Sequence, residues 1–322
     1  GLMARNSNIP PEAIEDVVVG CAFPEGPQGM LMARAVSILS DLPVETGGKV
    51  VNRFCGSSMD SVHQLSQAIL AGDIDAGIAG GVEDMFGVPM GGFNPSFHPD
   101  LYEKELYIGM GDTAEILANE LDISRDDQES FSIKSHEKAL AAIEGGGFKN
   151  EIIPVEINGI SIEQDEGPRV PNMEKIKSLD PAFDIEGSIT AATSSPISVG
   201  AAAAIVMGKE KADELDLSAK FKIRSRAVAG VDWKRMGSGP LPATEKALKK
   251  AGLAMDDIET IELNEAFAAQ SLYVIRKGKW DMDKINLNGG AIALGHPLGC
   301  SGVRLLVTLM NVMEQQGTSL GL

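Results

Sequence analysis

The feature that most constrains the fold of this chain is an internal repeat with an offset of 244 residues. Three pairs of segments share their hydrophobic pattern at this offset: 14–19 with 258–263, 58–71 with 302–315, and 76–78 with 320–322. Because the pairs also keep the same order along the chain, duplication explains them better than chance similarity between short strings. We therefore expect two related halves that fold in the same way.

Strand-like and helix-like patterns alternate in both halves. The first half has short apolar strands at 17–19, 49–52 and 76–80, and helical stretches at 29–39 and 58–71. The second half has strand-like segments at 221–225, 258–263 and 284–288, and helical stretches at 243–250 and 302–315. This alternation predicts an α/β fold built from βαβ units.

Residues 85–197 interrupt this rhythm. A stretch rich in Gly, Pro and Phe at 85–98 is followed by helical patterns near 111–120 and 125–144, and then by a loop-like segment at 165–171. We interpret 85–197 as an inserted subdomain that covers one face of the sheets, because binding elements commonly lie on such connections.

The repeat also sets the expected domain boundaries. The N-terminal half comprises 1–84 plus 198–217, the inserted loop domain 85–197, and the C-terminal half 218–322. Compared with the other half, the N-terminal half lacks its first strand and the C-terminal half lacks its last strands. We therefore expect a chain that is shortened at both ends.

Charge and composition exclude several classes of function. The 322 residues carry 28 basic and 46 acidic side chains, and this net charge of −18 disfavours nucleic acid as a partner. No run of eighteen apolar residues offers a membrane span. Three cysteines are too few for a disulfide framework in so long a chain, and they suit a reducing compartment.

One stretch, 209–250, is basic, with 11 Lys and Arg against 6 Asp and Glu, whereas residues 1–150 carry a net charge of −14. Two interpretations stay open. Charge pairs on solvated helix faces explain most such stretches, and a local positive field can also attract an anionic small molecule.

Cys55 is the first candidate for chemistry. It lies in NRFCGSS (52–58), after a buried strand and at the start of a helix. A helix N-terminus stabilises anions and lowers the pKa of a thiol, and Gly56 lets a substrate approach backbone N–H groups that can stabilise an oxyanion. A buried structural role is commoner for an arbitrary Cys, but this strand–Cys–Gly–helix arrangement favours a nucleophile.

His296 is the candidate base. It lies in GGAIALGHPLG (289–299), a glycine-rich loop that falls close to Cys55 in the repeat, so the two loops should meet at corresponding edges of the sheets. A loop His is usually solvated, but one that meets a candidate nucleophile is better interpreted as its base. His63, His98 and His136 lack this context, and we expect surface or capping roles for them.

The motif NEAFAAQ (264–270) directly follows the strand-like segment at 258–263. Asn264 can orient a water or donate to an oxyanion, and Glu265 can orient a neighbouring imidazole. Helix N-capping is the common alternative for Asn, and it would be preferred without the surrounding motifs.

In this order, the three motifs NRFCGSS, NEAFAAQ and GGAIALGHPLG resemble those of the thiolase family, and most closely those of the 3-ketoacyl-CoA thiolases of fatty-acid β-oxidation. The resemblance spans essentially the whole chain, including FKNEIIP (148–154) and DEGPR (165–169). Each motif alone is moderately specific, and the three together are highly specific.

The resemblance implies a thiolase fold of α-β-α-β-α layers, made of duplicated βαβαβ halves with an inserted loop domain. Cys55 matches the nucleophile that takes the acyl group, His296 the imidazole that activates it, and Asn264 the Asn that holds an oxyanion-hole water. Ser195 matches a Ser that contacts the pantetheine, and Met110 a Met that lines the acyl pocket.

The implied reaction is the thiolytic cleavage of 3-ketoacyl-CoA to acetyl-CoA and a shortened acyl-CoA through a cysteine acyl-enzyme, or the reverse Claisen condensation. Coenzyme A is then a co-substrate, and we expect no permanently bound cofactor and no metal. The family further implies a homodimer or tetramer. A multienzyme complex of β-oxidation is a possible partner. We expect a cytoplasmic protein of bacterial type, or a mitochondrial or peroxisomal one in a eukaryote.

One departure from the family bears on the mechanism. Thiolases carry a second catalytic cysteine in a Cys-x-Gly motif, which the resemblance places just beyond Leu322. Cys300 lies within the His296 motif and Cys21 in a different loop, so neither replaces it. We favour a thiolase whose C-terminal part lies outside this sequence.

Two alternative functions stay open. A decarboxylating ketoacyl synthase needs no second Cys, and Cys55, His296 and Asn264 would suit it, but the motifs around them are those of thiolases. A degenerate thiolase-fold protein would bind acyl-CoA or a partner subunit without turnover. The presence of all three residues disfavours that reading.

Overall fold

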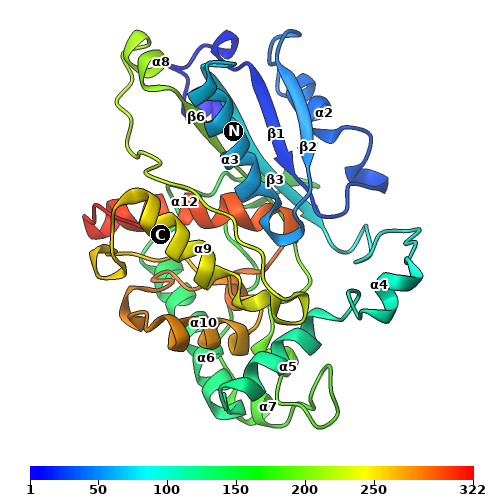
Figure 1. Cartoon of the computed structure of the whole chain (residues 1–322). Helices are drawn as coiled ribbons and strands as arrows, with labels where there is room; N and C mark the ends of the chain where they lie inside the picture. The colour runs from blue at the N-terminus through cyan, green and yellow to red at the C-terminus, as the bar shows by residue number, and fades with distance from the viewer. The chain divides into compact units, whose positions relative to one another are not determined.

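The computed structural model describes residues 1–322 as two compact units (Figure 1). The first unit consists of Gly1–Pro95, Ile197–Lys222 and Pro297–Val307, and the second of Ser96–Pro196, Ile223–His296 and Thr308–Leu322. None of the helices combines the length and the apolar character that crossing a membrane requires.

Helices and strands alternate along much of the chain. The α-helices are α1 (Leu2–Arg5), α2 (Met32–Leu39), α3 (Ser57–Ala71), α4 (Pro99–Glu103), α5 (Met110–Glu120), α6 (Arg125–Glu144), α7 (Met173–Lys177), α8 (Lys209–Glu214), α9 (Pro240–Ala251), α10 (Ala268–Gly278), α11 (Ala291–Leu294) and α12 (Ser301–Gln316). The strands are β1 (Asp16–Gly20), β2 (Gly47–Val51), β3 (Ala76–Asp84), β4 (Val155–Ile157), β5 (Ile160–Ile162) and β6 (Val199–Met207).

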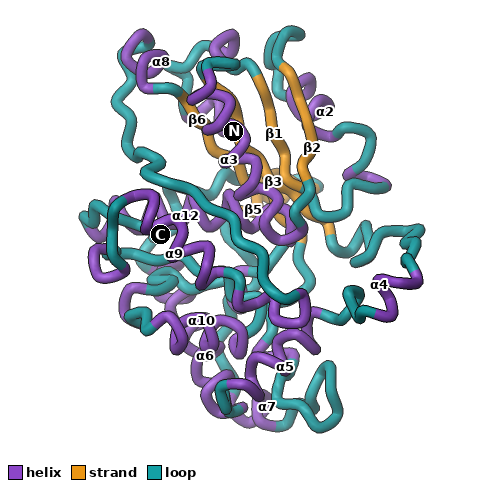
Figure 2. Tube along the Cα trace, viewed as in Figure 1, coloured by secondary structure: helices purple, strands orange, loops and turns teal.

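The first unit is built on a four-stranded sheet with the order β2-β1-β3-β6 (Figure 2). β1 pairs in parallel with β2 and β3, and β6 runs antiparallel to β3. β1, β2, β3 and the helix α3 lie where the alternating pattern of the sequence predicts them, whereas β6 was not predicted. The expected α/β fold with a largely parallel sheet is confirmed.

The alternation of side chains along β1 explains why helices cover both faces of this sheet. Val17 and Val19 point into one apolar cluster, with Ala33 of α2. Val18 points into another, with Val62 and Leu65 of α3. Each buried valine contributes about 1.5–3 kcal/mol relative to an exposed one, so both helices are held by apolar burial on opposite faces.

The end of β1 and the start of α3 touch through a glycine. A Cβ on Gly20 would lie 2.2 Å from the backbone nitrogen of Ser58. No larger residue fits there without moving the helix, and this close approach positions the turn that precedes α3.

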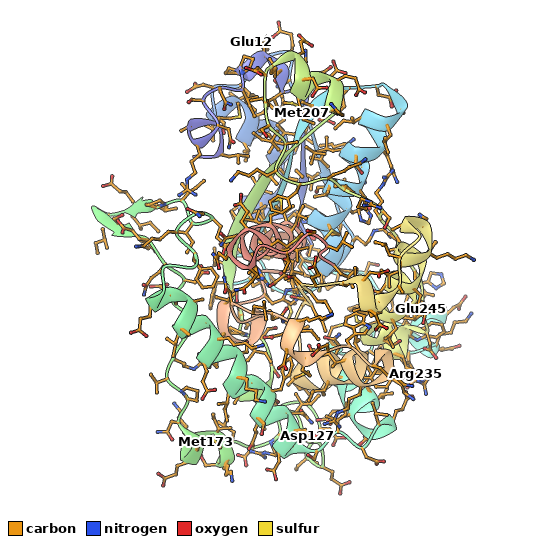
Figure 3. All side chains as sticks on the ribbon, turned by 90° about the vertical axis from the view of Figure 1, so that its left-hand side faces the viewer. Glu12, Asp127, Met173, Met207, Arg235 and Glu245 are labelled. Carbon is orange, nitrogen blue, oxygen red and sulfur yellow. The ribbon has the colours of Figure 1, made fainter.

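The second unit is mainly helical. Its apolar cluster gathers around α10, where Val274 is fully buried, and includes Leu117 of α5 and Phe131 of α6. Its only strands, β4 and β5, form an antiparallel hairpin that stands clear of the helices of its own unit (Figure 3).

The duplication appears in the backbone pairing. In β1 and β3, Asp16 pairs in parallel with Gly77. At an offset of 244 residues, Thr260 pairs in parallel with Gly321. A second parallel bridge joins Ile261 to the 284–288 segment. The strand-like segments of the second half therefore keep the expected partners, but they form isolated bridges rather than full strands.

The strand expected at 221–225 is wrong. No backbone–backbone hydrogen bond involves residues 221–231, and a strand requires a neighbouring strand. Side-chain hydrogen bonds to α9 hold this segment instead. Ser225 Oγ donates to the carbonyl of Ala247 at 2.8 Å, and Lys250 Nζ donates to the carbonyl of Arg226 at 2.9 Å.

Candidate active site

Cys55 lies on a single 3-10 turn, Phe54–Gly56, between β2 and α3 of the first unit. Ser57 Oγ donates to the carbonyl of Phe54 at 2.6 Å and closes the turn. Asn52 Nδ2 donates to the carbonyl of Ala22 at 2.8 Å and ties the turn to the chain after β1. The thiol therefore stands at the junction of strand and helix where the sequence predicts it.

The ionisation of this thiol differs from the prediction. Burial raises the pKa of Cys55 to about 11, and the negative charge of Glu83 adds to the rise. The lowered pKa expected from the helix N-terminus is wrong, because desolvation of the thiolate outweighs the stabilising backbone contact. Cys55 is therefore a protonated thiol at neutral pH, and it needs a base to become a nucleophile.

Glu83, near the end of β3, is a buried carboxylate that the sequence analysis did not single out. Its side chain is 1% exposed. It accepts hydrogen bonds from the backbone of Ala22 at 2.7 Å, from Gln28 Nε2 at 2.6 Å and from the backbone of Gly299 at 2.8 Å. The available signal was a carboxylate near the end of an apolar strand, at the same sheet edge as Cys55.

The other two cysteines are free and buried. Burial, followed by the charge of Glu83, raises the pKa of Cys21 to about 12. The Cys21 thiol lies 3.6 Å from Glu83 Oε1, and Cys300 is also buried. That neither serves as a second catalytic cysteine stays a prediction from the sequence.

In the second unit, the structure brings Asn264 and His296 together. Asn264 Nδ2 lies 3.3 Å from Nε2 of His296, whose side chain is 4% exposed. Asn264 Oδ1 is buried and accepts no hydrogen bond from the protein. Helix capping does not explain this residue, because α10 begins only at Ala268 and its N-cap residue is Phe267. The pair offers polar groups that a water or an oxyanion can contact.

Ser195 lies beside the same motif. Its backbone N–H donates to the carbonyl of Ala266 at 2.9 Å. The preceding residue, Ser194, forms an antiparallel bridge with Phe267. The structure thus joins the Ser195 segment to the segment that carries Asn264, although the two are far apart in sequence.

Met110 is the first residue of α5, with 44% of its side chain exposed. The next residue, Gly111, lies against the ring of Phe183, since a Cβ there would come within 2.1 Å of that ring. Phe183 contacts Phe267 edge to face, with ring centroids 5.6 Å apart. An apolar path therefore connects the start of α5 with the NEAFAAQ motif.

Two of the remaining histidines have clear roles. His98 caps α4, because its Nδ1 accepts the N–H of Asp100 at 3.2 Å. His136 is buried on α6, and burial, with a smaller effect of Arg169, lowers its pKa to about 4. The surface or capping role expected for His136 is therefore wrong, and its Nδ1 accepts the backbone N–H of Arg169 at 3.4 Å.

Many cations of the basic stretch are paired within the protein. On α8, Lys211 pairs with Glu214 at 2.9 Å. Arg235, labelled in Figure 3, pairs with Glu120, and Lys234 pairs with Glu105. These contacts support the interpretation as charge pairs.

The candidate residues fall in both units. Cys55 belongs to the first unit, whereas His296, Asn264, Ser195 and Met110 belong to the second. The pairing of Cys55 with His296 stays a prediction from the sequence.

Three relatives of this chain carry the name 3-ketoacyl-CoA thiolase. A 3-ketoacyl-CoA thiolase of Shewanella baltica is 48% identical over 334 residues, which covers 100% of this chain and 86% of the relative. The 3-ketoacyl-CoA thiolases of Shewanella loihica and Vibrio vulnificus are 47% and 45% identical, with the same coverage of both chains.

Two family models also match, and together they cover nearly all of the chain. The model described as thiolase, N-terminal domain, matches residues 1–210. The model described as thiolase, C-terminal domain, matches residues 217–322. Matches of this extent, with the three motifs in the family's order, establish that the chain belongs to the thiolase family.

Proposed function

We propose that the chain is an acyltransferase that cleaves 3-ketoacyl-CoA with coenzyme A, giving acetyl-CoA and a shortened acyl-CoA, and that it can run the reverse condensation. The observation that carries the chemistry is the contact between half-buried Asn264 and buried His296, whose side-chain nitrogens lie 3.3 Å apart. The substrate class rests on the relatives, which are named 3-ketoacyl-CoA thiolases.

In the proposed first half-reaction, His296 takes the proton of the Cys55 thiol. The sulfur then forms a bond to the keto carbon of the substrate. Asn264 and His296 would stabilise an oxyanion of the reaction through polar contacts or a bound water. The bond between the keto carbon and the adjacent CH₂ breaks, and the carbanion takes up one proton, which balances the proton lost by the Cys55 thiol, and leaves as acetyl-CoA.

In the second half-reaction, the thiolate of coenzyme A attacks the thioester on Cys55. The new carbon–sulfur bond gives the shortened acyl-CoA, and Cys55 leaves as thiolate and recovers its proton. The pKa of about 11 for Cys55 supports the need for a base in this scheme, since so little thiolate forms unaided at neutral pH.

Further parts of the proposal follow the family and the relatives. We propose that Ser195 contacts the pantetheine and Met110 the acyl chain, with coenzyme A as co-substrate and no resident cofactor. We further propose a homodimer or tetramer, as the family implies, and a location in the bacterial cytoplasm, because the relatives are bacterial. The division into halves 1–84 plus 198–217 and 218–322, around a loop domain 85–197, belongs to the same proposal.

The test is a steady-state assay of the protein with 3-ketoacyl-CoA substrates of several chain lengths. We expect coenzyme A-dependent formation of acetyl-CoA. Consumption of a malonyl thioester without thiolysis would instead support a decarboxylating ketoacyl synthase. Binding of coenzyme A with no turnover would support a degenerate, non-enzymatic protein.

A further inference from the structure

We infer that Glu265 is a positioning residue, which fixes the glycine-rich loop that ends at His296 against the segment that carries Asn264. The inference rests on the proposed function, because it assigns Glu265 a part in the same site. The carboxylate acts through its neighbours, and nothing requires it to touch the substrate.

The first observation is the set of donors around this carboxylate. Glu265 is 2% exposed. Its Oε2 accepts hydrogen bonds from Ser135 Oγ at 2.6 Å and from the backbone N–H of Ile292 at 3.2 Å. Its Oε1 accepts from Asn286 Nδ2 at 2.8 Å. A buried carboxylate so surrounded by donors stabilises the groups that donate to it.

The loop is held at two points. Besides the bond from Ile292, the backbone N–H of Gly290 donates to Ser135 Oγ at 3.0 Å. The Ser135 hydroxyl therefore bridges Glu265 and a second loop amide, because it donates to the carboxylate and accepts from Gly290. The contact also requires glycine, because a Cβ on Gly290 would lie 2.2 Å from the carboxyl carbon of Glu265. His296 follows Ile292 by four residues, so the anchor is close to the imidazole along the chain.

The other side of the carboxylate holds the Asn264 segment. Asn286 Oδ1 accepts the backbone N–H of Leu263 at 2.8 Å, and Asn286 Nδ2 donates to the Leu263 carbonyl at 2.8 Å. Leu263 directly precedes Asn264, and Glu265 directly follows it. Glu265 thus joins the two segments whose side chains meet in the contact between Asn264 and His296.

The expectation that Glu265 orients a neighbouring imidazole stays a prediction, and the hydrogen bonds above give the carboxylate a second role. The carboxylate accepts hydrogen bonds from Ser135, Asn286 and the loop backbone. Glu265 sets the place of the loop, and the loop sets the place of His296.

The experiment compares Glu265→Gln and Ser135→Ala with wild type. Both oxygens of Glu265 accept hydrogen bonds, so in Glu265→Gln the side-chain NH₂ group replaces one of these acceptors and faces a donor. In Ser135→Ala the backbone N–H of Gly290 loses its acceptor. A misplacement of about 1 Å can cost about 100-fold in rate, so we expect kcat to fall about 10- to 100-fold with KM within about twofold. Hydrogen exchange of the amides at 290–292 should become faster.

The matched control is Glu129→Gln. Glu129 is also a buried carboxylate of the second unit, on the same helix as Ser135, but it pairs with Arg125 at 2.7 Å. We expect kcat within about twofold of wild type and unchanged exchange at 290–292, because its partner lies outside the loop. If Glu265→Gln fails to fold, Ser135→Ala and Gly290→Ala carry the comparison.

The outcomes separate this inference from the proposed function. If the wild type catalyses thiolysis, and Glu265→Gln and Ser135→Ala keep both its kcat and its hydrogen exchange at 290–292, the inference is overturned and the proposed function stands. Equal losses in the Glu129→Gln control would also overturn it. Absence of thiolysis in wild type would overturn the function, and loop exchange would still show whether Glu265 anchors the loop.

Discussion

At the scale of single residues, the thiol of Cys55 makes the need for a base testable. With a pKa of about 11, its unassisted alkylation by iodoacetamide should rise about tenfold per pH unit between pH 7 and pH 10. We expect His296→Ala to show this steep profile and wild type to react at least about tenfold faster at neutral pH. Identical profiles for the two proteins would remove His296 as the base for Cys55.

Asn264 supports a second prediction at this scale. Its buried Oδ1 has no hydrogen-bond partner in the protein. Replacing the side chain therefore removes the amide that faces His296 without depriving any donor of the protein of its acceptor. We expect Asn264→Ala to lower kcat about 10²- to 10³-fold, as for the loss of an oxyanion donor. The melting temperature should stay close to that of wild type. A kcat within a factor of about three would show that Asn264 does not stabilise the oxyanion.

The site residues that could be predicted from the sequence differ from those that could not in how far away along the chain their partners lie. Cys55, His296 and Asn264 were found because each lies in a motif whose local pattern of strand, glycine and helix points to its role. Glu83 and Ser135 were not found. Their partners lie 216 and 130 residues away, from Gly299 to Glu83 and from Ser135 to Glu265. No local pattern encodes such hydrogen bonds.

At the scale of elements, the contact of β1 with α3 predicts an effect on stability. A Cβ on Gly20 would meet the backbone of Ser58 at 2.2 Å, and backbone cannot move aside as a flexible side chain can. We expect Gly20→Ala to lower the free energy of unfolding by about 1–3 kcal/mol through overpacking. Denaturant unfolding measures this change.

Gly230→Ala is the matched control for that prediction. A Cβ there has no atom within 4 Å, so we expect its free energy of unfolding to stay within about 0.5 kcal/mol of wild type. If Gly20→Ala were as stable as Gly230→Ala, the close packing of β1 on α3 would be contradicted.

The elements also show which local patterns are decisive. The helix 125–144, which begins at a capping box formed by Ser124 and Asp127, and the strands β1, β2 and β3 were predictable from the sequence, whereas β6 was not predicted. The alternation at 221–225 suggested a strand equally well, but hydrogen-bonded neighbours decide whether a strand forms. Hydrogen bonds with α9 hold this part of the chain instead, from Ser225 Oγ to the carbonyl of Ala247 and from Lys250 Nζ to the carbonyl of Arg226.

At the scale of the whole molecule, His136 should make stability depend on pH. Burial, with a smaller effect of Arg169, lowers its pKa from 6.5 to about 4 in the folded state. Between these values the unfolded chain binds more protons than the folded one, so stability falls as the pH drops. We expect this residue to account for about 3 kcal/mol between pH 7 and pH 4.

Denaturant unfolding of wild type and His136→Gln at several pH values measures that contribution. The variant should be less sensitive to acid through this window, because Gln does not titrate. A variant that loses as much stability as wild type between pH 7 and pH 4 would show that His136 is not the group responsible.

The account of the whole molecule depends on one covalent intermediate, the acyl group on Cys55. Mass spectrometry of the protein, quenched after mixing with a 3-ketoacyl-CoA in the absence of free coenzyme A, detects it directly. We predict an acyl adduct on the peptide that contains Cys55, and its loss in Cys55→Ala together with thiolysis. An adduct on another residue, or thiolysis that persists in Cys55→Ala, would contradict the account.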